Sequence, residues 1–255
     1  MKLNNIELSF DNFASEMAKL KNEKHFDYLV TIIGEDFGEE GLGCIYILEN
    51  TQTNERCSVK TIAKKVDGSD VIPTVINLWK VADLLEREVF DFVGIKFLGH
   101  PDMRRLFLRT DFQGYPLRKD FDMSPEANKF PCTDEPEDDF TMEYSLSEDG
   151  HLVATEKRRF DEDEYVVNIG PNHPSTHGVL RLQTVIDGET VKRIYPHLGY
   201  IHRGIEKMWE NMTYPQTLAL TDRLNYLSAM MHRHALYRQR RERQRLRADD
   251  LHHAA

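Results

Sequence analysis

Runs in which apolar and polar residues alternate predict strands in the first third of the chain. Residues 43–48 and 57–62 are two short apolar runs, and the polar stretch 49–55 between them is expected to form a turn. An earlier strand is predicted because apolar residues recur at every second position, the period of a half-buried strand. These positions are Phe26, Tyr28, Val30 and Ile32.

Apolar residues at steps of three and four predict one amphipathic helix that starts near residue 70. Ser69 or Asp70 would cap this helix, since both side chains can accept a backbone N–H. Pro73 would lie in its first turn, where no N–H is needed, and Gly94 would end it. The apolar stripe consists of Ile72, Val75, Ile76, Trp79, Ala82, Leu85, Val89 and Phe92.

Between residues 122 and 164 the periodicity fades, and prolines and runs of acidic residues take its place. Like charges and few apolar residues favour an extended, solvated connector. An acidic linker is therefore predicted over residues 126–164.

A second folded segment is predicted over residues 165–231, with a hairpin whose turn is the dipeptide Asp187-Gly188. Its expected strands are 165–169, 179–186 and 189–194, and its expected helices are 204–212 and 217–231. The predicted fold class is α+β. The predicted organisation is a domain over 1–125, the linker 126–164, the segment 165–231 and a tail over 232–255.

Composition narrows the function classes. The net charge of −10 argues against nucleic acid as a partner, because phosphate binding needs a basic surface. The cysteines Cys44, Cys57 and Cys132 are far apart, which argues against a disulfide scaffold and against an iron–sulfur or zinc site held by this chain alone. Neither a signal peptide nor a transmembrane segment is predicted, so membrane association would come through a partner.

Two further patterns concern the chain's ligands and its last residues. No G-x-G-x-x-G motif is present, so no dinucleotide site is expected. Residues 232–255 contain seven Arg, no Lys and three acidic residues, a local charge of +4 against −14 for the rest. This Arg/His-rich composition departs abruptly from the preceding sequence. A basic tail for acidic partners is one interpretation, and a truncated or frameshifted reading frame is the other.

The first motif begins at Glu86-Arg87-Glu88 and continues through residues 89–92, 94–101, 104–105 and 116–120. Taken singly, such charged residues at a helix end are ordinary surface chemistry, and a lone His in a turn is rarely a ligand. The whole string resembles the signature of the 30 kDa subunit (the C subunit) of respiratory complex I, the NADH:quinone oxidoreductase. The resemblance implies a structural interface in the peripheral arm and no catalytic residue. The implied interface signature is Glu86, Arg87, Glu88, His100 and Arg104.

The second motif, over residues 168–181, reads N-I-G-P-N-H-P-S-T-H-G-V-L-R. His173 and His177 stand four residues apart, which on a helix would suggest a metal pair. The glycines and prolines around them disfavour a helix, and no Glu follows His173 as in H-E-x-x-H. A turn that projects two imidazoles into a cleft is the better interpretation, and no metal site is predicted.

Together with residues 199–207 and 220–228, this motif resembles the start of the 49 kDa subunit (the D subunit) of the same enzyme, whose domain is similar to the hydrogenase large subunit. The order of both resemblances matches the fused C/D subunit of some bacteria. The resemblance implies that His177 and Tyr226 donate protons to quinone, which needs two electrons and two protons to become quinol. The implied neighbours in the quinone loop are His173, Ser175 and Thr176.

The same resemblance implies the partners and the location of the chain. Quinone would be the substrate, and the electrons would come from NADH through FMN and iron–sulfur clusters on other subunits, with proton translocation coupled to their transfer. The implied neighbours are the B subunit with its iron–sulfur cluster, the I subunit, and the H subunit at the membrane. The chain would be peripheral, on the cytoplasmic face of the bacterial inner membrane.

There are alternative interpretations of Tyr226, of the enzyme class and of the function class. Tyr226 alone would be interpreted as a core aromatic of an amphipathic helix. Hydrogenase activity is excluded, because Asn225 and Ser228 stand where the metal's thiolate ligands would be. The match also fades after about residue 231, so the isolated chain is expected to show no quinone reductase activity. A non-catalytic assembly or docking module, in which only the first domain folds, is the second function class.

Overall fold

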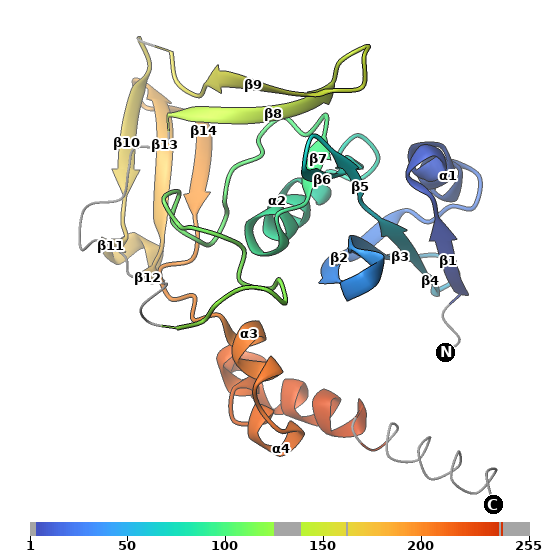
Figure 1. Cartoon of the computed structure of the whole chain (residues 1–255). Helices are drawn as coiled ribbons and strands as arrows, with labels where there is room; N and C mark the ends of the chain where they lie inside the picture. Colours follow the sequence, from blue (N-terminus) through green and yellow to red (C-terminus); the bar gives the residue numbers. More distant parts are fainter. Residues whose placement is uncertain (1–3, 125–138, 162, 240, 242–255) are drawn as a thin grey trace, which may run out of the picture. The chain divides into compact units, whose positions relative to one another are not determined.

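A computed structural model describes residues 4–124, 139–161, 163–239 and 241. The chain divides into two compact units, Met1–His202 and Arg203–Ala255 (Figure 1). The boundary between these units falls inside the stretch 165–231 that the sequence predicts as one folded segment. Within the described residues the first unit carries all of the strands, and the second is helical.

The first unit contains a four-stranded sheet in the order β1-β4-β3-β2. The predicted strands 43–48 and 57–62 are confirmed as β3 and β4, which pair antiparallel around a short turn. A shift of register between Leu29 and Thr31 places Leu29 and Ile32 inside, so Tyr28 is exposed instead of buried. The elements are β1 (Asn4–Leu8), β2 (Tyr28–Asp36), η1 (Gly38–Glu40), β3 (Leu42–Asn50) and β4 (Glu55–Ile62).

Helix α1 (Phe10–Asn22) is an element that the sequence analysis missed. Its buried residues Phe13, Met17 and Leu20 recur at steps of four and three, so the helical period was present in the sequence. The helix contacts β1, β4 and β6 (Ser69–Pro73) and supplies one wall of the core.

The prediction of one helix from residue 70 is wrong in its first half. Ser69–Pro73 forms strand β6, which pairs with β5 (Lys64–Val66) and with β7 (Lys96–Leu98). Ile72 precedes a proline, a position that disfavours helical backbone. The helix α2 spans only Ala82–Val93 and ends at Gly94 in the left-handed conformation, as predicted.

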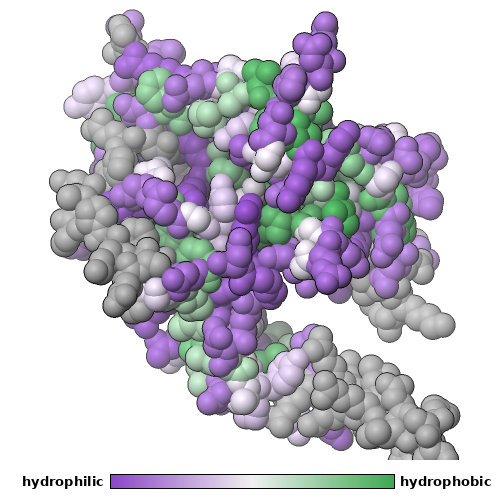
Figure 2. Space-filling model, viewed as in Figure 1, coloured by the Kyte–Doolittle hydropathy of each residue, from purple (hydrophilic) through white to green (hydrophobic). Residues whose placement is uncertain are grey.

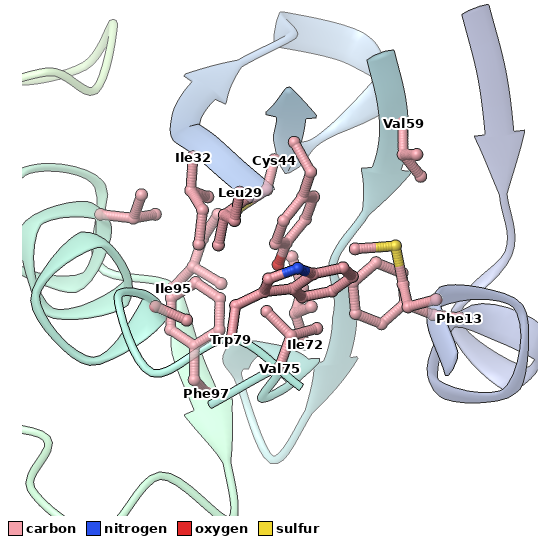
Figure 3. Close-up of a cluster of buried hydrophobic side chains, with 14 of the residues drawn as sticks. Phe13, Leu29, Ile32, Cys44, Val59, Ile72, Val75, Trp79, Ile95 and Phe97 are labelled. Atoms are coloured by element: carbon pink, nitrogen blue, oxygen red, sulfur yellow. The ribbon is translucent and has the colours of Figure 1, made fainter. Parts of the chain in front are cut away.

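The burial that this stripe predicts is nevertheless found. Ile72, Val75 and Trp79 are buried in a strand and a turn rather than on a helix. Figure 3 shows the Trp79 indole at the centre of the core cluster, with Ile95 and Phe97 to one side and Phe13 of α1 to the other. The apolar spacing therefore predicts which residues are buried, but not the strand and turn that bury them.

Part of the predicted acidic linker is a hairpin. Strands β8 (Phe140–Leu146) and β9 (Leu152–Arg158) pair antiparallel and complete a sheet in the order β5-β6-β7-β8-β9. The backbone N–H of Gly99 donates to the carbonyl of Tyr144, and that of Met103 to the carbonyl of Met142. An extended, solvated connector is therefore wrong for these residues, while 126–138 and 162 lie outside the described part.

The predicted hairpin around Asp187-Gly188 is confirmed. Strands β13 and β14 pair antiparallel on either side of this turn, and β10 adds to β13. A separate two-stranded ladder joins β11 to β12 and encloses one turn of 3₁₀ helix. The elements are β10 (Tyr165–Ile169), β11 (Asn172–His173), η2 (Pro174–Thr176), β12 (Gly178–Val179), β13 (Arg181–Asp187) and β14 (Thr190–His197).

The second unit contains short helical pieces. Helix α3 (Ile205–Glu210) confirms the predicted helix 204–212. The single predicted helix 217–231 is wrong, because Asn225 has extended backbone and interrupts it. The pieces are α4 (Tyr214–Thr217), η3 (Thr221–Arg223), η4 (Tyr226–Ser228) and a helical stretch at 229–239.

The visible face of the molecule is largely hydrophilic, with apolar residues showing in separate patches (Figure 2). Within the described residues, no helix combines the length and the apolar content that crossing a bilayer would need.

Candidate functional site

The turn that carries both motif histidines is a closed loop between β11 and β12. His173 pairs with Gly178 across this ladder, and Pro174 occupies the first position of η2, where its missing N–H costs no hydrogen bond. The turn is not an α-helix, as the prolines and glycines predict. The two imidazoles are thus presented from a hairpin tip rather than from one helix face.

The side chain of His173 is held by its neighbour Ser175. Its Nδ1 accepts the backbone N–H of Ser175 at 3.2 Å and lies 2.6 Å from the Ser175 hydroxyl oxygen. A ring nitrogen that accepts carries no proton, so the neutral imidazole of His173 has its proton on Nε2. Ser175 therefore fixes the tautomer of His173.

The side chain of Thr176 bridges the two strands that flank the same turn. Its hydroxyl oxygen lies 2.8 Å from the carbonyl oxygen of His173 and 2.9 Å from that of Gly178. These two carbonyls belong to the two strands of the ladder, so one hydroxyl ties the strands together. Ser175 and Thr176 thus hold the shape of the turn.

His177 ends the turn and is exposed. Its backbone is left-handed, with φ of 51°, a conformation in which His is enriched among non-glycine residues. Its imidazole makes no hydrogen bond with the part of the chain that the structure describes. His177 and His173 line one open depression, together with Pro171, Pro174 and Val179.

A glycine at the start of the turn is required by geometry. Gly170 has φ of 92°, and a Cβ atom there would lie 2.0 Å from the carbonyl oxygen of Leu180. No other residue type has the space or the conformational freedom for this position. The close approach joins the start of the turn to the residue that follows β12.

Tyr226 lies in the second unit and His177 in the first, so neither unit by itself contains the predicted pair. Tyr226 opens η4 and its side chain is 86% exposed. The interpretation of Tyr226 as a core aromatic is therefore wrong. Asn225 caps η4 through its Oδ1, which accepts the N–H of Leu227.

Glu86 of the predicted interface signature is fully buried. Its two carboxylate oxygens accept the Thr74 hydroxyl at 2.6 Å and the Val75 N–H at 2.8 Å. Burial raises the pKa of Glu86 to about 7. The two hydrogen bonds lower this pKa, because they favour the ionised form, but the effect of burial is larger. Glu86 thus fixes the turn between β6 and α2.

Arg87 and Arg104 share the carboxylate of Asp102. Arg104 binds it through two nitrogens at 2.5 and 2.6 Å, and Arg87 Nη1 lies 3.7 Å from it. Burial would raise the pKa of Asp102, but the Arg104 hydrogen bonds and the nearby Arg charges lower it overall. Arg87 also donates to the carbonyls of Arg104 and Arg105, so it anchors the loop after β7 to α2.

His100 is also an internal residue. It is fully buried, its Nε2 lies 3.2 Å from the carbonyl oxygen of Asp83, and its Nδ1 accepts the N–H of Asp102. The side chains of Glu86, Arg87, His100 and Arg104 are buried inside this chain, and their place in an interface signature stays a prediction. Of the five, only Glu88 is half-buried and retains a partly accessible surface.

The sequence analysis missed Asp91, the buried carboxylate that holds the same loop. Its Oδ2 accepts three consecutive backbone N–H groups, from Leu106, Phe107 and Leu108. Its Oδ1 binds Arg105 at 2.9 Å. In the sequence, only the nearby Arg104-Arg105 doublet indicates that the buried carboxylate of Asp91 has a partner.

The part of the chain that the structure describes holds no cluster of three His, Cys, Asp or Glu suited to a metal.

The first half of the chain is similar to a known protein family. Residues 6–127 match the model of a family described as the respiratory-chain NADH dehydrogenase 30 kDa subunit. These residues cover β1 to the loop held by Asp91, which is nearly the span of the predicted first domain. Residues 6–127 are therefore similar to the 30 kDa subunits of respiratory-chain NADH dehydrogenases.

The similarity to curated proteins extends beyond residue 127. The NADH-quinone oxidoreductase C/D subunit of Phocaeicola vulgatus is 52% identical over 231 residues, which cover 91% of this chain and 44% of that protein. The NADH-quinone oxidoreductase C/D subunit of Bacteroides thetaiotaomicron is 51% identical over 232 residues, which cover 87% of this chain and 43% of that protein. The predicted relationship to a fused C/D subunit is confirmed. The chain spans less than half the length of these relatives.

One solved structure is also similar. The membrane-bound sulfane sulfur reductase, an archaeal respiratory membrane complex, contains a chain that is 28% identical, with a TM-score of 0.44. The match covers 54% of this chain and 85% of that one.

Proposed function

We propose that this chain forms part of the quinone site of an NADH:quinone oxidoreductase, with His177 and Tyr226 as the proton donors. Reduction of a quinone to a quinol requires a proton at each of two carbonyl oxygens. An imidazolium or a phenol can supply each proton when it lies within hydrogen-bond reach. The relatives named as the C/D subunit of this enzyme support the assignment.

The observation that carries the proposal is the presentation of His177. The turn around it is closed by internal hydrogen bonds of Ser175 and Thr176, while the His177 imidazole has no hydrogen bond within the described residues. A fixed backbone with an unengaged, exposed side chain is what a group that meets an external ligand needs. His173 cannot take this role through Nδ1, because that atom is engaged by Ser175.

The proposed electron route lies outside this chain. Electrons would pass from NADH through FMN and iron–sulfur clusters on other subunits, the last of them on the B subunit, to quinone as substrate. The I and H subunits would be further neighbours, and the assembly would lie at the cytoplasmic face of the bacterial cell membrane and couple electron transfer to proton translocation. The isolated chain would show no quinone reductase activity, because the proposed electron donors lie on other subunits.

The test is made in the assembled enzyme in membranes, with His177→Ala and Tyr226→Phe introduced separately. We expect each variant to lower the rate of NADH:quinone reduction by about 10²–10⁴-fold, the usual contribution of a positioned acid. NADH oxidation with ferricyanide should stay at the wild-type rate if electrons still enter. Tyr165→Phe, at another exposed tyrosine, is the matched control. Wild-type quinone reduction in both variants would contradict the proposal.

A non-catalytic assembly module with only the first domain folded is the second candidate. Pairing of Leu98 in β7 with Tyr144 in β8 does not favour it, since residues beyond 139 complete a sheet of the first unit. Limited proteolysis separates the two candidates. Protection through residue 226 supports the quinone-site proposal, and loss of everything beyond the acidic stretch supports the module.

A further inference from the structure

A cleft of about 320 Å³ in the first unit is lined by five arginines. One wall is the loop 104–110 and the other is the segment 195–200, which leads out of β14. None of the described residues that line the cleft is acidic. The arginines are Arg87, Arg104, Arg105, Arg109 and Arg181.

The two walls of the cleft are fixed to each other. Gly199 has φ of 95°, and a Cβ atom there would lie 2.0 Å from the carbonyl oxygen of Phe107. The ring of His202 stacks on those of Phe92 and Phe107, with centroids 5.1 and 5.5 Å away. Asp91 fixes the opposite loop through three backbone N–H groups. The cleft is therefore a preorganised feature of the fold, not a gap between mobile loops.

Positive charge is in excess at this cleft. Asp91 binds Arg105, Asp102 binds Arg104 and Arg87, and Asp111 binds Arg109. Within the described residues, these three carboxylates pair with four of the five lining arginines, and the fifth, Arg181, has no carboxylate partner, in a chain whose net charge is −10. Such a local excess in an acidic protein attracts anions.

Arg181 of β13 contributes a hydrogen-bond donor that lacks an acceptor. Its Nε is buried and has no hydrogen-bond partner within the described residues. Its Nη2 lies 3.5 Å from Nε2 of His197, the outer limit of a hydrogen bond. Buried donors without acceptors are rare in folded proteins, and a missing ligand is one of the ordinary reasons for them.

The chemistry of the cleft suits a carboxylate better than a phosphate. Phosphate sites commonly use successive backbone N–H groups, and those of Leu106, Phe107 and Leu108 are already taken by Asp91. The guanidinium groups of the lining are planar and suit a planar carboxylate, which such groups bind through paired N–H donors. Tyr195 and Tyr200, also in the lining, add ring surface beside them.

We propose that this cleft is a binding site for a carboxylate group, with Arg181 as its principal free donor. The carboxylate would come from an acidic side chain of a neighbouring chain or from a small carboxylic acid. The inference goes beyond the quinone proposal and does not rest on it, because His177 and Tyr226 are not part of the cleft.

The test uses the full chain at 0.15 M salt and follows the Arg Nε–H signals by NMR during titration. The probes are a capped peptide with two adjacent Glu residues, succinate, and inorganic phosphate. We expect the Arg181 signal to shift with the peptide or with succinate, and Arg181→Gln to weaken that binding at least about tenfold, as expected for a charge-assisted hydrogen bond. Arg56→Gln, which breaks an exposed ion pair with Glu49, should leave it unchanged.

The outcomes separate the sources and decide the proposal. Binding of the peptide alone supports a partner's side chain, and binding of succinate alone supports a small acid. Arg109→Gln, at a partly exposed position of the same lining, provides a second variant should Arg181→Gln unfold. Binding of phosphate alone, of no probe, or of carboxylates with equal affinity to wild type and both cleft variants would overturn the proposal.

Discussion

Asp91 and Arg105 form a buried ion pair in which Oδ1 and Nη1 lie 2.9 Å apart. The second oxygen of the same carboxylate accepts three backbone N–H groups of the loop that follows Arg105. One fully buried side chain of α2 thus neutralises an arginine and satisfies the loop's donors at once. This loop is also one wall of the arginine cleft, so the shape of the cleft depends on Asp91.

Asp91→Asn should destabilise the first unit by about 3–5 kcal/mol, the usual cost of removing one partner from a buried ion pair. The amide has a single acceptor oxygen and no charge, so Arg105 and several N–H groups would lose their acceptor. Urea unfolding measures the change. Asp187→Asn is the matched control, because its pair with Lys192 is exposed and Asn-Gly is as good a turn as Asp-Gly. Equal midpoints for the two variants would refute the assigned role.

Glu86 should make the stability of the first unit fall as pH rises. Its pKa is raised from 4.5 in the unfolded chain to about 7 in the folded one. The folded state therefore binds more protons between these values, and the contribution that is complete below pH 4.5 is lost as pH rises through 7. At about 1.4 kcal/mol per pKa unit, the full span of about 2.5 units amounts to about 3.5 kcal/mol.

Glu86→Gln should remove this dependence, because the amide oxygen can still accept the Val75 N–H and its NH₂ can donate to Thr74. The measurement is urea unfolding of both proteins at several pH values between 4.5 and 8, plotted as a difference. Glu16→Gln, on the exposed side of α1, serves as the control. A constant difference across this range would show that Glu86 stays ionised in the folded protein.

The sequence predicted strands more reliably than helices here, for a physical reason. Strands 43–48 and 57–62 pair with each other across a short turn, so local alternation and local pairing agree. Around Ile72 the apolar spacing suits a helix, but the backbone pairs with strands that lie on both sides of it along the sequence. Burial of Val75 and Trp79 does not require a helix, only a turn that points both inward.

Some features of the candidate site could also be predicted from the sequence, and others could not. The closed turn around His177 follows from the glycines and prolines in the motif itself, so it could be predicted. Asp91 could not be found, because its hydrogen-bond partners stand fifteen to seventeen residues away in a loop without regular structure. Charged residues such as Glu86 and Arg87 are usually exposed, so a sequence pattern alone assigns them to the surface.

Gly170→Ala should disrupt the start of the histidine turn. The position combines φ of 92° with a clash of the new Cβ against the Leu180 carbonyl oxygen. Backbone strain alone would cost about 1–3 kcal/mol. Gly188→Ala separates the two effects, since Gly188 has φ of 60° and open space around its Cβ, and should cost about 1–2 kcal/mol. Urea unfolding measures both, and a Gly170→Ala effect no larger than that of Gly188→Ala would mean that the close approach to Leu180 is absent.

Ser175→Ala should change the tautomer of the His173 imidazole. In the wild type, the Ser175 hydroxyl and backbone N–H both point at Nδ1, which keeps the proton on Nε2. Removing the hydroxyl leaves one donor, and the loss of a hydrogen bond worth about 1 kcal/mol shifts the tautomer ratio about fivefold toward Nδ1–H. The ¹⁵N chemical shifts of the two ring nitrogens, recorded at a pH where the ring is neutral, report this ratio directly. Ser175→Thr retains the hydroxyl and should keep the wild-type shifts. If Ser175→Ala also keeps them, the backbone N–H alone fixes the ring, and the hydroxyl is available to an external ligand instead.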